Sequence, residues 1–237
     1  MFLISGPKMV IESCKSGVIG SFPFTNARTL DILENWIVEI KSELKHQNCK
    51  TPWAANIITH STYGKFDGEL ELISKYKPPI VITALGSPKR VIETVKKYGG
   101  LIFADVSSIK YAKKCAETNI DGLVLVCTGA GGHTGNLSPF VFIKEVRKFW
   151  KGKIILAGGI SDGTSIKSAI ILGADYAYMG TRFLACNESM ACEDYNEIVI
   201  NATFVDIIII NYFCVFFCYL FIDSVFGFVL FFVFLLY

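Results

Sequence analysis

Short apolar runs alternate with helical segments along most of this 237-residue chain, and that alternation constrains the fold more than any other feature. The runs are rich in Val, Ile and aromatic residues and end at Gly, Ser, Asp or Thr, as strands buried on both faces do. Eight can be counted, at residues 2–4, 17–20, 53–58, 80–84, 101–105, 122–127, 154–157 and 176–179. Helical periodicity with frequent Lys and Glu marks the intervening segments, including 31–45, 88–98, 109–118, 139–149 and 163–172.

A repeating strand and helix order leaves two architectures, an open doubly wound sheet or a closed (β/α)8 TIM barrel. Eight strands favour the barrel, and the chain is just under the usual size of one. An open dinucleotide-binding sheet would carry GxGxxG after its first strand, where this chain has Ser5-Gly6-Pro7. We therefore expect an α/β TIM barrel over residues 1–203. Its first strand is either very short or partly missing, because the first run starts at Phe2.

Several predicted helices carry signals for their ends. Ser87-Pro88 and Ser138-Pro139 each place a hydroxyl cap before a proline at the first helical position. Gly99 and Gly173 are expected to adopt the left-handed conformation that ends a helix before the next strand.

Composition excludes several classes of function. Lys and Arg number 23 against 21 Asp and Glu, and this net charge of +2 predicts no nucleic-acid partner. The eight cysteines form no CxxC pair in a chain too long to need disulfide staples, so a reducing, cytoplasmic location is expected. No cationic segment followed by a short apolar run opens the sequence, so export is not predicted. The three histidines lack metal-ligand spacing, which predicts no metal site.

Glycine-rich loops follow the last three predicted strands, at residues 128–135, 158–163 and 180–182. In a TIM barrel such loops lie at the carboxyl ends of the strands, where activity gathers. Amides without a neighbouring Cβ can approach a phosphate closely, and a helix beginning near Thr164 would add its dipole. A tight turn would explain any single glycine pair, but three successive loops favour a bound phosphate or flavin. The candidate binding residues are Gly131, Gly132, Gly158, Gly159, Gly180 and Thr181.

His133 is the most informative single residue because it lies within the first of these loops. A neutral imidazole there could accept a proton from an acidic carbon. The alternative is that it hydrogen-bonds the loop or a cofactor. His46 is expected at a solvated helix end, whereas His60 follows the third predicted strand and could line the site.

Two further polar residues lie at predicted strand ends. Asn56 could hydrogen-bond the edge of a flavin ring, and Asp105 could face the same cavity. Each could equally be a helix cap, as polar residues after strands often are.

Several motifs occur together in an order that is specific. Residues 129–135 read Gly-Ala-Gly-Gly-His-Thr-Gly, and residues 173–183 read Gly-Ala-Asp-Tyr-Ala-Tyr-Met-Gly-Thr-Arg-Phe. Ser5-Gly-Pro, residues 17–23 (Gly-Val-Ile-Gly-Ser-Phe-Pro) and residues 26–28 (Asn-Ala-Arg) precede them. With these motifs the sequence resembles the nitronate monooxygenase (2-nitropropane dioxygenase) family over about residues 1–206.

The resemblance implies a flavoprotein oxidoreductase with noncovalently bound FMN. It assigns flavin or phosphate contacts to the glycine-loop candidates, a flavin contact to Asn56 and the role of catalytic base to His133. The implied monooxygenase reaction is oxidative denitrification, in which a nitroalkane loses its α proton to His133, or arrives as the nitronate, and reduces FMN before O2 reacts. The expected partners are therefore a small nitronate or nitroalkane and O2.

Two alternatives to this function stay open. A flavin-dependent enoyl reductase of the related barrel type shares the glycine-histidine loop but takes hydride from a nicotinamide. A catalytically inactive barrel could bind flavin or a phosphate compound without turnover.

The last 34 residues, 204–237, are predicted to form a separate hydrophobic tail whose only charges are Asp206 and Asp223. The run at 207–222 is slightly short for a spanning helix, and 224–237 is shorter still. Three interpretations stay open: a membrane anchor through residues 207–237, an aberrant C-terminus and a buried helix.

Overall fold

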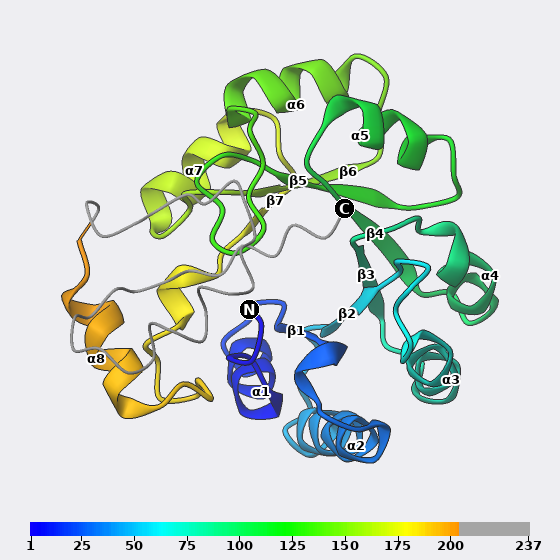
Figure 1. Cartoon of the computed structure of the whole chain (residues 1–237), viewed down its shortest axis with the longest axis vertical. Coiled ribbons are helices and arrows are strands. Elements are labelled where there is room, and N and C mark those ends of the chain that lie inside the picture. The colour runs from blue at the N-terminus through cyan, green and yellow to red at the C-terminus, as the bar shows by residue number, and fades with distance from the viewer. Residues whose placement is uncertain (204–237) are drawn as a thin grey trace.

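The computed structural model describes residues 1–203 and shows one sheet of parallel strands inside a ring of helices (Figure 1). Its strand order follows the chain, from β1 to β7, so each strand pairs with its sequence neighbours. The strands are β1 Ser21–Pro23, β2 Ala54–Ile58, β3 Ile80–Ala84, β4 Leu101–Val106, β5 Gly122–Val126, β6 Lys153–Ala157 and β7 Tyr176–Tyr178. This sequential parallel order is that of a TIM barrel.

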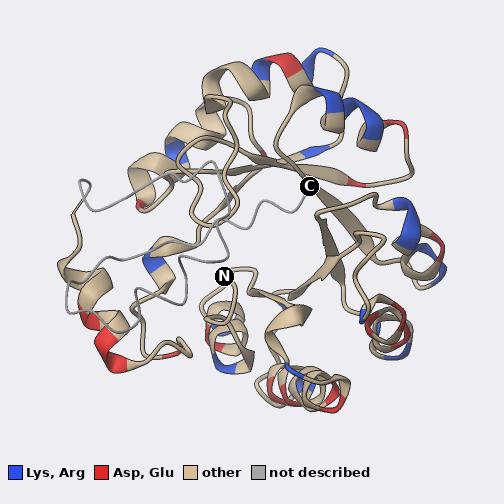
Figure 2. Cartoon of the chain, in the orientation of Figure 1, with Lys and Arg blue, Asp and Glu red and all other residues tan. Residues whose placement is uncertain are grey.

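Helices connect successive strands and cover the outer face of the sheet (Figure 1). Their bounds are α1 Pro7–Lys15, α2 Leu30–His46, α3 Phe66–Tyr76, α4 Lys89–Lys97, α5 Ile109–Ala116, α6 Pro139–Arg147, α7 Gly163–Ile171 and α8 Glu193–Asn201. Two short 3-10 helices, η1 Phe24–Asn26 and η2 Thr181–Phe183, follow β1 and β7. Lys, Arg, Asp and Glu gather mostly on the outer helices (Figure 2).

The sheet is buried on both faces, which explains the continuous apolar runs. The outer face packs against the helices in one large cluster that includes Ile102, Leu123 and Phe142. A smaller cluster fills the inner face and consists of Ala54, Ile80, Ile82, Phe103, Val124 and Ala157. Residues that alternate with the outer cluster along a strand therefore face the barrel interior.

The predicted fold class is confirmed with seven strands among the described residues, and β1 and β7 do not pair with each other there. The expected first strand at residues 2–4 is wrong: these residues form a turn in which Leu3 has φ +60°. The backbone of this segment hydrogen-bonds the Asn26 side chain and not a neighbouring strand. Asn26 Oδ1 accepts from Leu3 N at 2.8 Å, and Asn26 Nδ2 donates to Ser5 O at 2.7 Å. The strand expected at 17–20 lies at 21–23, because Gly17 adopts φ +81°.

The helix signals are partly confirmed. Gly99 and Gly173 have φ of +79° and +106°, so both are left-handed as expected. Ser138 occupies the N-cap position of α6, but its side chain makes no capping hydrogen bond. At α4 the N-cap is Pro88, one residue later than expected, and Ser87 Oγ accepts from Lys89 N at 3.3 Å.

Within residues 1–203, no helix has the length and apolar character needed to cross a bilayer. The interpretations of residues 204–237 concern a segment outside the described residues, so the division into two regions stays a prediction.

Candidate active site

The three glycine loops contact one another at the carboxyl ends of β5, β6 and β7. Gly159 N donates to Gly129 O at 2.9 Å, which joins the loop after β6 to the loop after β5. A Cβ added at Gly131 would lie 3.1 Å from Thr181 Oγ1, which brings the loop after β7 against the same loop. The structure thus brings together the segments that the sequence assigned to one site.

The loop that contains His133 folds back onto the end of β5. Thr128 N donates to Leu137 O at 3.0 Å, and Gly135 N donates to Cys127 O at 3.3 Å. The Thr134 hydroxyl donates to the same Cys127 carbonyl at 3.2 Å. These bonds hold both ends of the loop and leave its tip, residues 130–133, at the mouth of the barrel.

The loops after β5 and β6 pack so closely at residue 158 that only a glycine fits there. Its φ is +133°, and an added Cβ would lie 2.9 Å from Thr128 O. That distance is shorter than real Cβ contacts, so any side chain would push the loops after β5 and β6 apart. The glycine therefore permits the contact that closes the site.

Gly132 and Gly159 have a different role, because both are left-handed and both face open space. Their φ values are +82° and +64°, and no atom lies within 4 Å of an added Cβ at either. The Gly159 amide already donates to Gly129 O, so it is not available to a ligand in this arrangement. At these two positions the backbone is not covered by other atoms, so a ligand can approach it closely.

Two helices begin near the loops, and they differ in whether their first amides are open to an anion. Helix α7 begins at Gly163, one residue before the expected Thr164, and Asp162 caps it by accepting from Ser165 N at 2.7 Å. That carboxylate already occupies the positive end of the helix dipole. At η2, by contrast, Gly180 is the N-cap, and the first amides of a helix have no partner within it.

Taken together, the loops fit a phosphate group. They combine uncovered glycine backbone, the amides at the start of η2 and the Thr181 hydroxyl, and the structure packs all three loops against one another. The residues that could hold an FMN phosphate are therefore Gly132, Gly158, Gly180 and Thr181.

His133 lies half-buried in the loop after β5. Burial lowers the pKa of its imidazole below the ordinary value of 6.5. A neutral imidazole at the carboxyl end of a barrel strand can accept a proton.

The other histidines are placed differently. His60 Nδ1 lies 2.8 Å from Thr62 Oγ1 within its own loop, a local contact that satisfies one ring nitrogen. His46 is the last residue of α2 and is exposed, as the sequence predicted.

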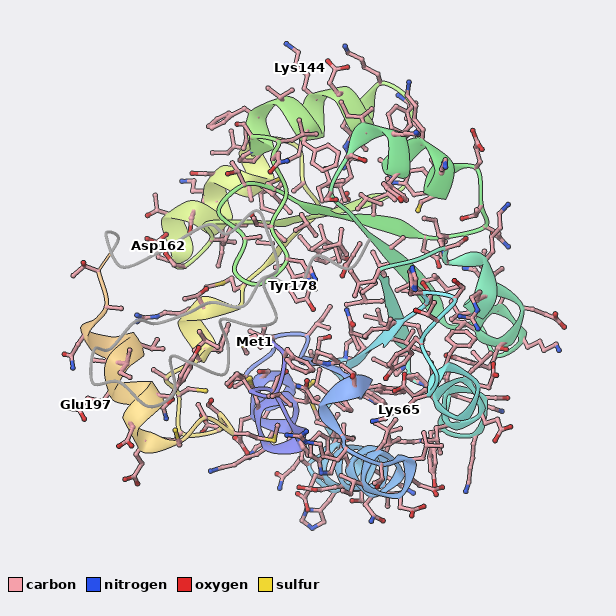
Figure 3. All side chains as sticks on the ribbon, viewed as in Figure 1. Met1, Lys65, Lys144, Asp162, Tyr178 and Glu197 are labelled. Carbon is pink, nitrogen blue, oxygen red and sulfur yellow. The ribbon has the colours of Figure 1, made fainter. Side chains whose placement is uncertain are left out.

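Asn56, Asp105 and Tyr178 form an inward-facing polar set in the barrel interior. Asn56 is the third residue of β2, not its last as expected, and its side chain hydrogen-bonds Asp105 of β4. Tyr178 of β7 lies close enough to Asp105 to feel its charge and lies near Ser21 of β1. Figure 3 labels Tyr178 and Met1, both inside the ring of helices. Sequence reasoning missed Tyr178, although its two-residue spacing from Tyr176 places both on one strand face.

Burial decides the ionisation of this set. It raises the pKa of Asp105 to about 7, against the opposing effects of the Asn56 hydrogen bond and the nearby Met1 α-amino group. Burial and the Asp105 charge raise the pKa of Tyr178 to about 12. The barrel interior thus contains a carboxyl group that holds its proton up to neutral pH.

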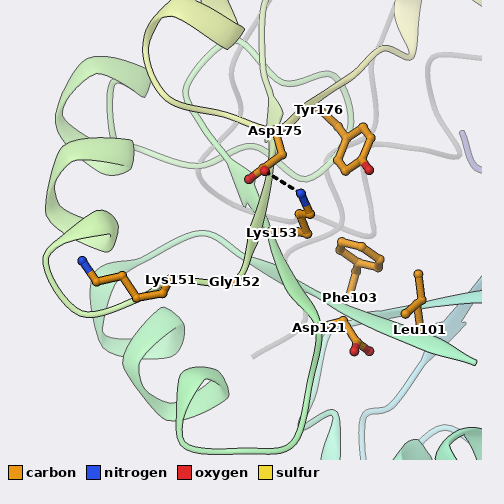
Figure 4. A pocket seen from close by; sticks show the side chains of 8 residues that line it. All are labelled: Leu101, Phe103, Asp121, Lys151, Gly152, Lys153, Asp175 and Tyr176. Atoms are coloured by element: carbon orange, nitrogen blue, oxygen red, sulfur yellow. Dashed lines mark hydrogen bonds and ion pairs between the residues drawn. The ribbon is translucent and has the colours of Figure 1, made fainter. Parts of the chain in front are cut away.

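A hollow of about 360 Å³ lies at the other end of the sheet, away from the glycine loops (Figure 4). It is bordered by the first residues of three strands, Leu101, Lys153 and Tyr176. Its acids are already engaged: Asp175 pairs with Lys153 at 3.0 Å, and Asp121 pairs with Lys96 at 2.6 Å. These ion pairs stabilise the amino ends of the strands, and both carboxylates among the described lining residues are paired.

Comparisons with known proteins agree with this geometry. The family model described as nitronate monooxygenase matches residues 16–214. A nitronate monooxygenase of Paraburkholderia phytofirmans is 33% identical over 138 residues, which are 54% of this chain and 38% of that protein. An octahydro-1H-indene-4-carboxyl-CoA dehydrogenase of Rhodococcus jostii is 25% identical over 186 residues, 78% of this chain and 50% of that protein.

Among solved structures, FabK from Thermotoga maritima superposes with a TM-score of 0.78 at 28% identity. The match covers 87% of this chain and 64% of FabK. The chain therefore spans between 38% and 64% of the length of these three relatives.

Proposed function

This chain belongs to the nitronate monooxygenase family of FMN-dependent oxidoreductases, and from that premise we propose that it binds FMN at the three glycine loops and oxidises a nitronate or nitroalkane with O2. The observation that supports this most strongly is the contact among the loops. Gly129 meets Gly159, and Gly131 meets Thr181, so segments from three strands surround one place. A small-molecule substrate is typical of the family.

In this proposal FMN supplies the redox chemistry when it is bound, and the chain binds, orients and handles protons. His133 Nδ1 or Nε2 takes the α proton of a neutral nitroalkane, since its lowered pKa keeps the imidazole unprotonated near neutral pH. The negative charge that the nitronate carries calls for preorganised hydrogen-bond donors beside the flavin ring, where such donors stabilise an anion. The free cysteines favour a reducing, cytoplasmic setting for this activity.

The test is an anaerobic titration of the FMN-loaded full chain. Propionate 3-nitronate is expected to bleach the flavin band near 450 nm, whereas NADH and NADPH are expected to leave it nearly unchanged. A flavin band that nitronate cannot bleach would contradict the proposed activity. Admitting O2 then tests turnover by release of nitrite.

The second candidate is the enoyl reductase alternative. Two observations favour keeping it: the likeness to FabK and the relative named as a dehydrogenase of a CoA ester. Under this candidate the same titration gives the reverse result, with rapid bleaching by NADH or NADPH. Bound FMN that neither nitronate nor nucleotide reduces would support the inactive binding barrel.

A further inference from the structure

Asp105 is placed to meet a ligand between the sheet and the glycine loops. It lies two residues after Phe103 on β4, and Phe103 belongs to the inner cluster, so both side chains face the barrel interior. Asp105 pairs in register with Val124 of β5, three residues before the His133 loop begins at Cys127. Its carboxyl group is therefore one layer nearer the glycine loops than the apolar floor formed by Phe103.

Only one of the two Asp105 carboxyl oxygens has a hydrogen-bond partner among the described residues. Oδ1 is shielded from solvent and has no hydrogen-bond partner among residues 1–203, so the Asn56 bond engages the other oxygen. The remaining groups that act on Asp105 are the Tyr178 hydroxyl and the Met1 α-amino group. A shielded polar atom without a partner costs free energy, so native structures keep few of them and a bound group often explains those that remain.

Two other aspartates of the same sheet show what a structural role looks like. Asp121 accepts from Ile102 N at 2.7 Å and pairs with Lys96. Asp175 accepts from Ile154 N at 2.9 Å and pairs with Arg147 and Lys153. Asp105 has neither a backbone donor nor a Lys or Arg partner among the described residues, which separates it from this stabilising pattern.

We propose that Asp105 is a ligand-binding residue whose Oδ1 hydroxyl donates a hydrogen bond to an acceptor oxygen or nitrogen of the molecule held by the glycine loops. Asn56 orients the group through its hydrogen bond to the carboxyl, and because Oδ1 has no partner we assign that bond to Oδ2 and the proton to Oδ1. The inference rests on the proposed function, since the acceptor belongs to the flavin ring or to the nitro group of the substrate. The raised pKa of about 7 agrees with a neutral donor below neutral pH.

The test measures the binding of each ligand and needs no O2. FMN affinity is measured by flavin fluorescence quenching on the flavin-free full chain at pH 6, and nitronate affinity from the concentration at which the rate of anaerobic flavin bleaching by propionate 3-nitronate reaches half its maximum. Asp105→Leu removes the donor at similar size, Asp105→Asn keeps a donor, and Asp121→Asn is the matched control at the opposite end of the sheet. Loss of one neutral hydrogen bond is expected to weaken binding about three- to tenfold.

We expect Asp105→Leu to lower the affinity for one of the two ligands by that factor. The affinities of Asp105→Asn and Asp121→Asn are expected to stay close to those of the wild type. A weaker FMN complex identifies the flavin ring as the acceptor, and a weaker nitronate complex identifies the substrate. Unchanged affinities for both ligands in a folded Asp105→Leu protein would overturn the proposal while leaving FMN binding and the proposed function intact. Wild-type protein that binds no FMN would overturn both.

A second measurement covers failure of the leucine variant to fold. If the flavin ring is the acceptor, the flavin spectrum of the wild-type holoprotein is expected to titrate at or above pH 7, since donation to the flavin further stabilises the protonated carboxyl, and Asp105→Asn is expected to abolish that titration. His133→Asn retains it if Asp105 is its source. A titration that persists in Asp105→Asn would contradict the proposal.

Discussion

As a base, His133 would need a neutral imidazole near the ligand, and its position in the loop after β5 is the basis for proposing that role. The loop folds back onto Cys127 and exposes its tip at the barrel mouth, while burial of the ring disfavours the imidazolium. The sequence was sufficient to single out this residue, because a histidine within a glycine loop after a strand is rare. Asn56 and Asp105 were also expected to face the cavity, but Tyr178 and the contacts among the three could not be predicted, since they come from three strands that only the fold brings together.

Replacing His133 by Asn should separate proton transfer from cofactor binding. We expect FMN to bind normally, turnover of neutral nitroalkane to fall by about a hundredfold or more, and turnover of preformed nitronate to change much less. In the wild type, kcat/KM for nitroalkane should rise with pH to a plateau, with its midpoint below 6.5 because the pKa is lowered. Equal losses on both substrates would remove proton abstraction from the role of His133.

Asp105 should make the flavin-free protein less stable as the pH rises. Its folded pKa of about 7 lies above the ordinary 3.8, so the folded state binds more protons between these values and loses stability across that window. Asp105→Asn cannot ionise, and we expect its melting temperature to exceed that of the wild type by more at pH 8 than at pH 5. A constant difference across this range would be inconsistent with the raised pKa.

At the scale of elements, the strands from β2 onward could be predicted within one or two residues because both faces are buried and the runs are nearly continuous. The structure at the start of the chain could not be predicted in this way. Residues 2–4 have strand composition, but a strand also needs a neighbour, and Asn26 takes the hydrogen bonds that a neighbour would provide. The loops were predictable as a group because glycine marks the positions where backbones must meet.

Gly158→Ala should push two of those loops apart. The added Cβ would meet Thr128 O at 2.9 Å, on a backbone with φ +133° that an alanine rarely adopts. We expect FMN affinity to fall by about tenfold or more, which corresponds to about 1.4 kcal/mol. Gly163→Ala is the matched control, because no atom lies within 4 Å of its added Cβ. Similar affinities in the two variants would show that loop contact does not govern binding.

The ion pairs at the amino ends of the strands stabilise the fold and are not part of the candidate site. Burial raises the pKa of Asp175, but the bonds from Ile154 N, Arg147 and Lys153 outweigh it and leave the pKa below 3.8. Its contribution is therefore present above about pH 4 and is lost as the pH falls through the folded pKa. Asp175→Asn should destabilise the fold by about 1–3 kcal/mol at pH 7 in urea unfolding. FMN affinity should not change, and a selective loss of binding would contradict this division between the two ends.

On the scale of the whole molecule, the sheet and its helices form the part of a TIM barrel that carries the glycine loops, and this chain spans 64% of the length of FabK from Thermotoga maritima. The family and the barrel architecture were predictable from sequence because motif order and strand spacing are distributed along the chain. The number of strands was not, since it depends on pairing at the sheet edges.

The central claim is that the three loops converge on the phosphate of FMN. Its most direct test is to compare the dissociation constants of FMN and riboflavin for the flavin-free protein, since the two ligands differ only in that phosphate. Two charge-assisted hydrogen bonds from the loops predict that FMN binds at least about a hundredfold more tightly. Equal dissociation constants for FMN and riboflavin would contradict the claim.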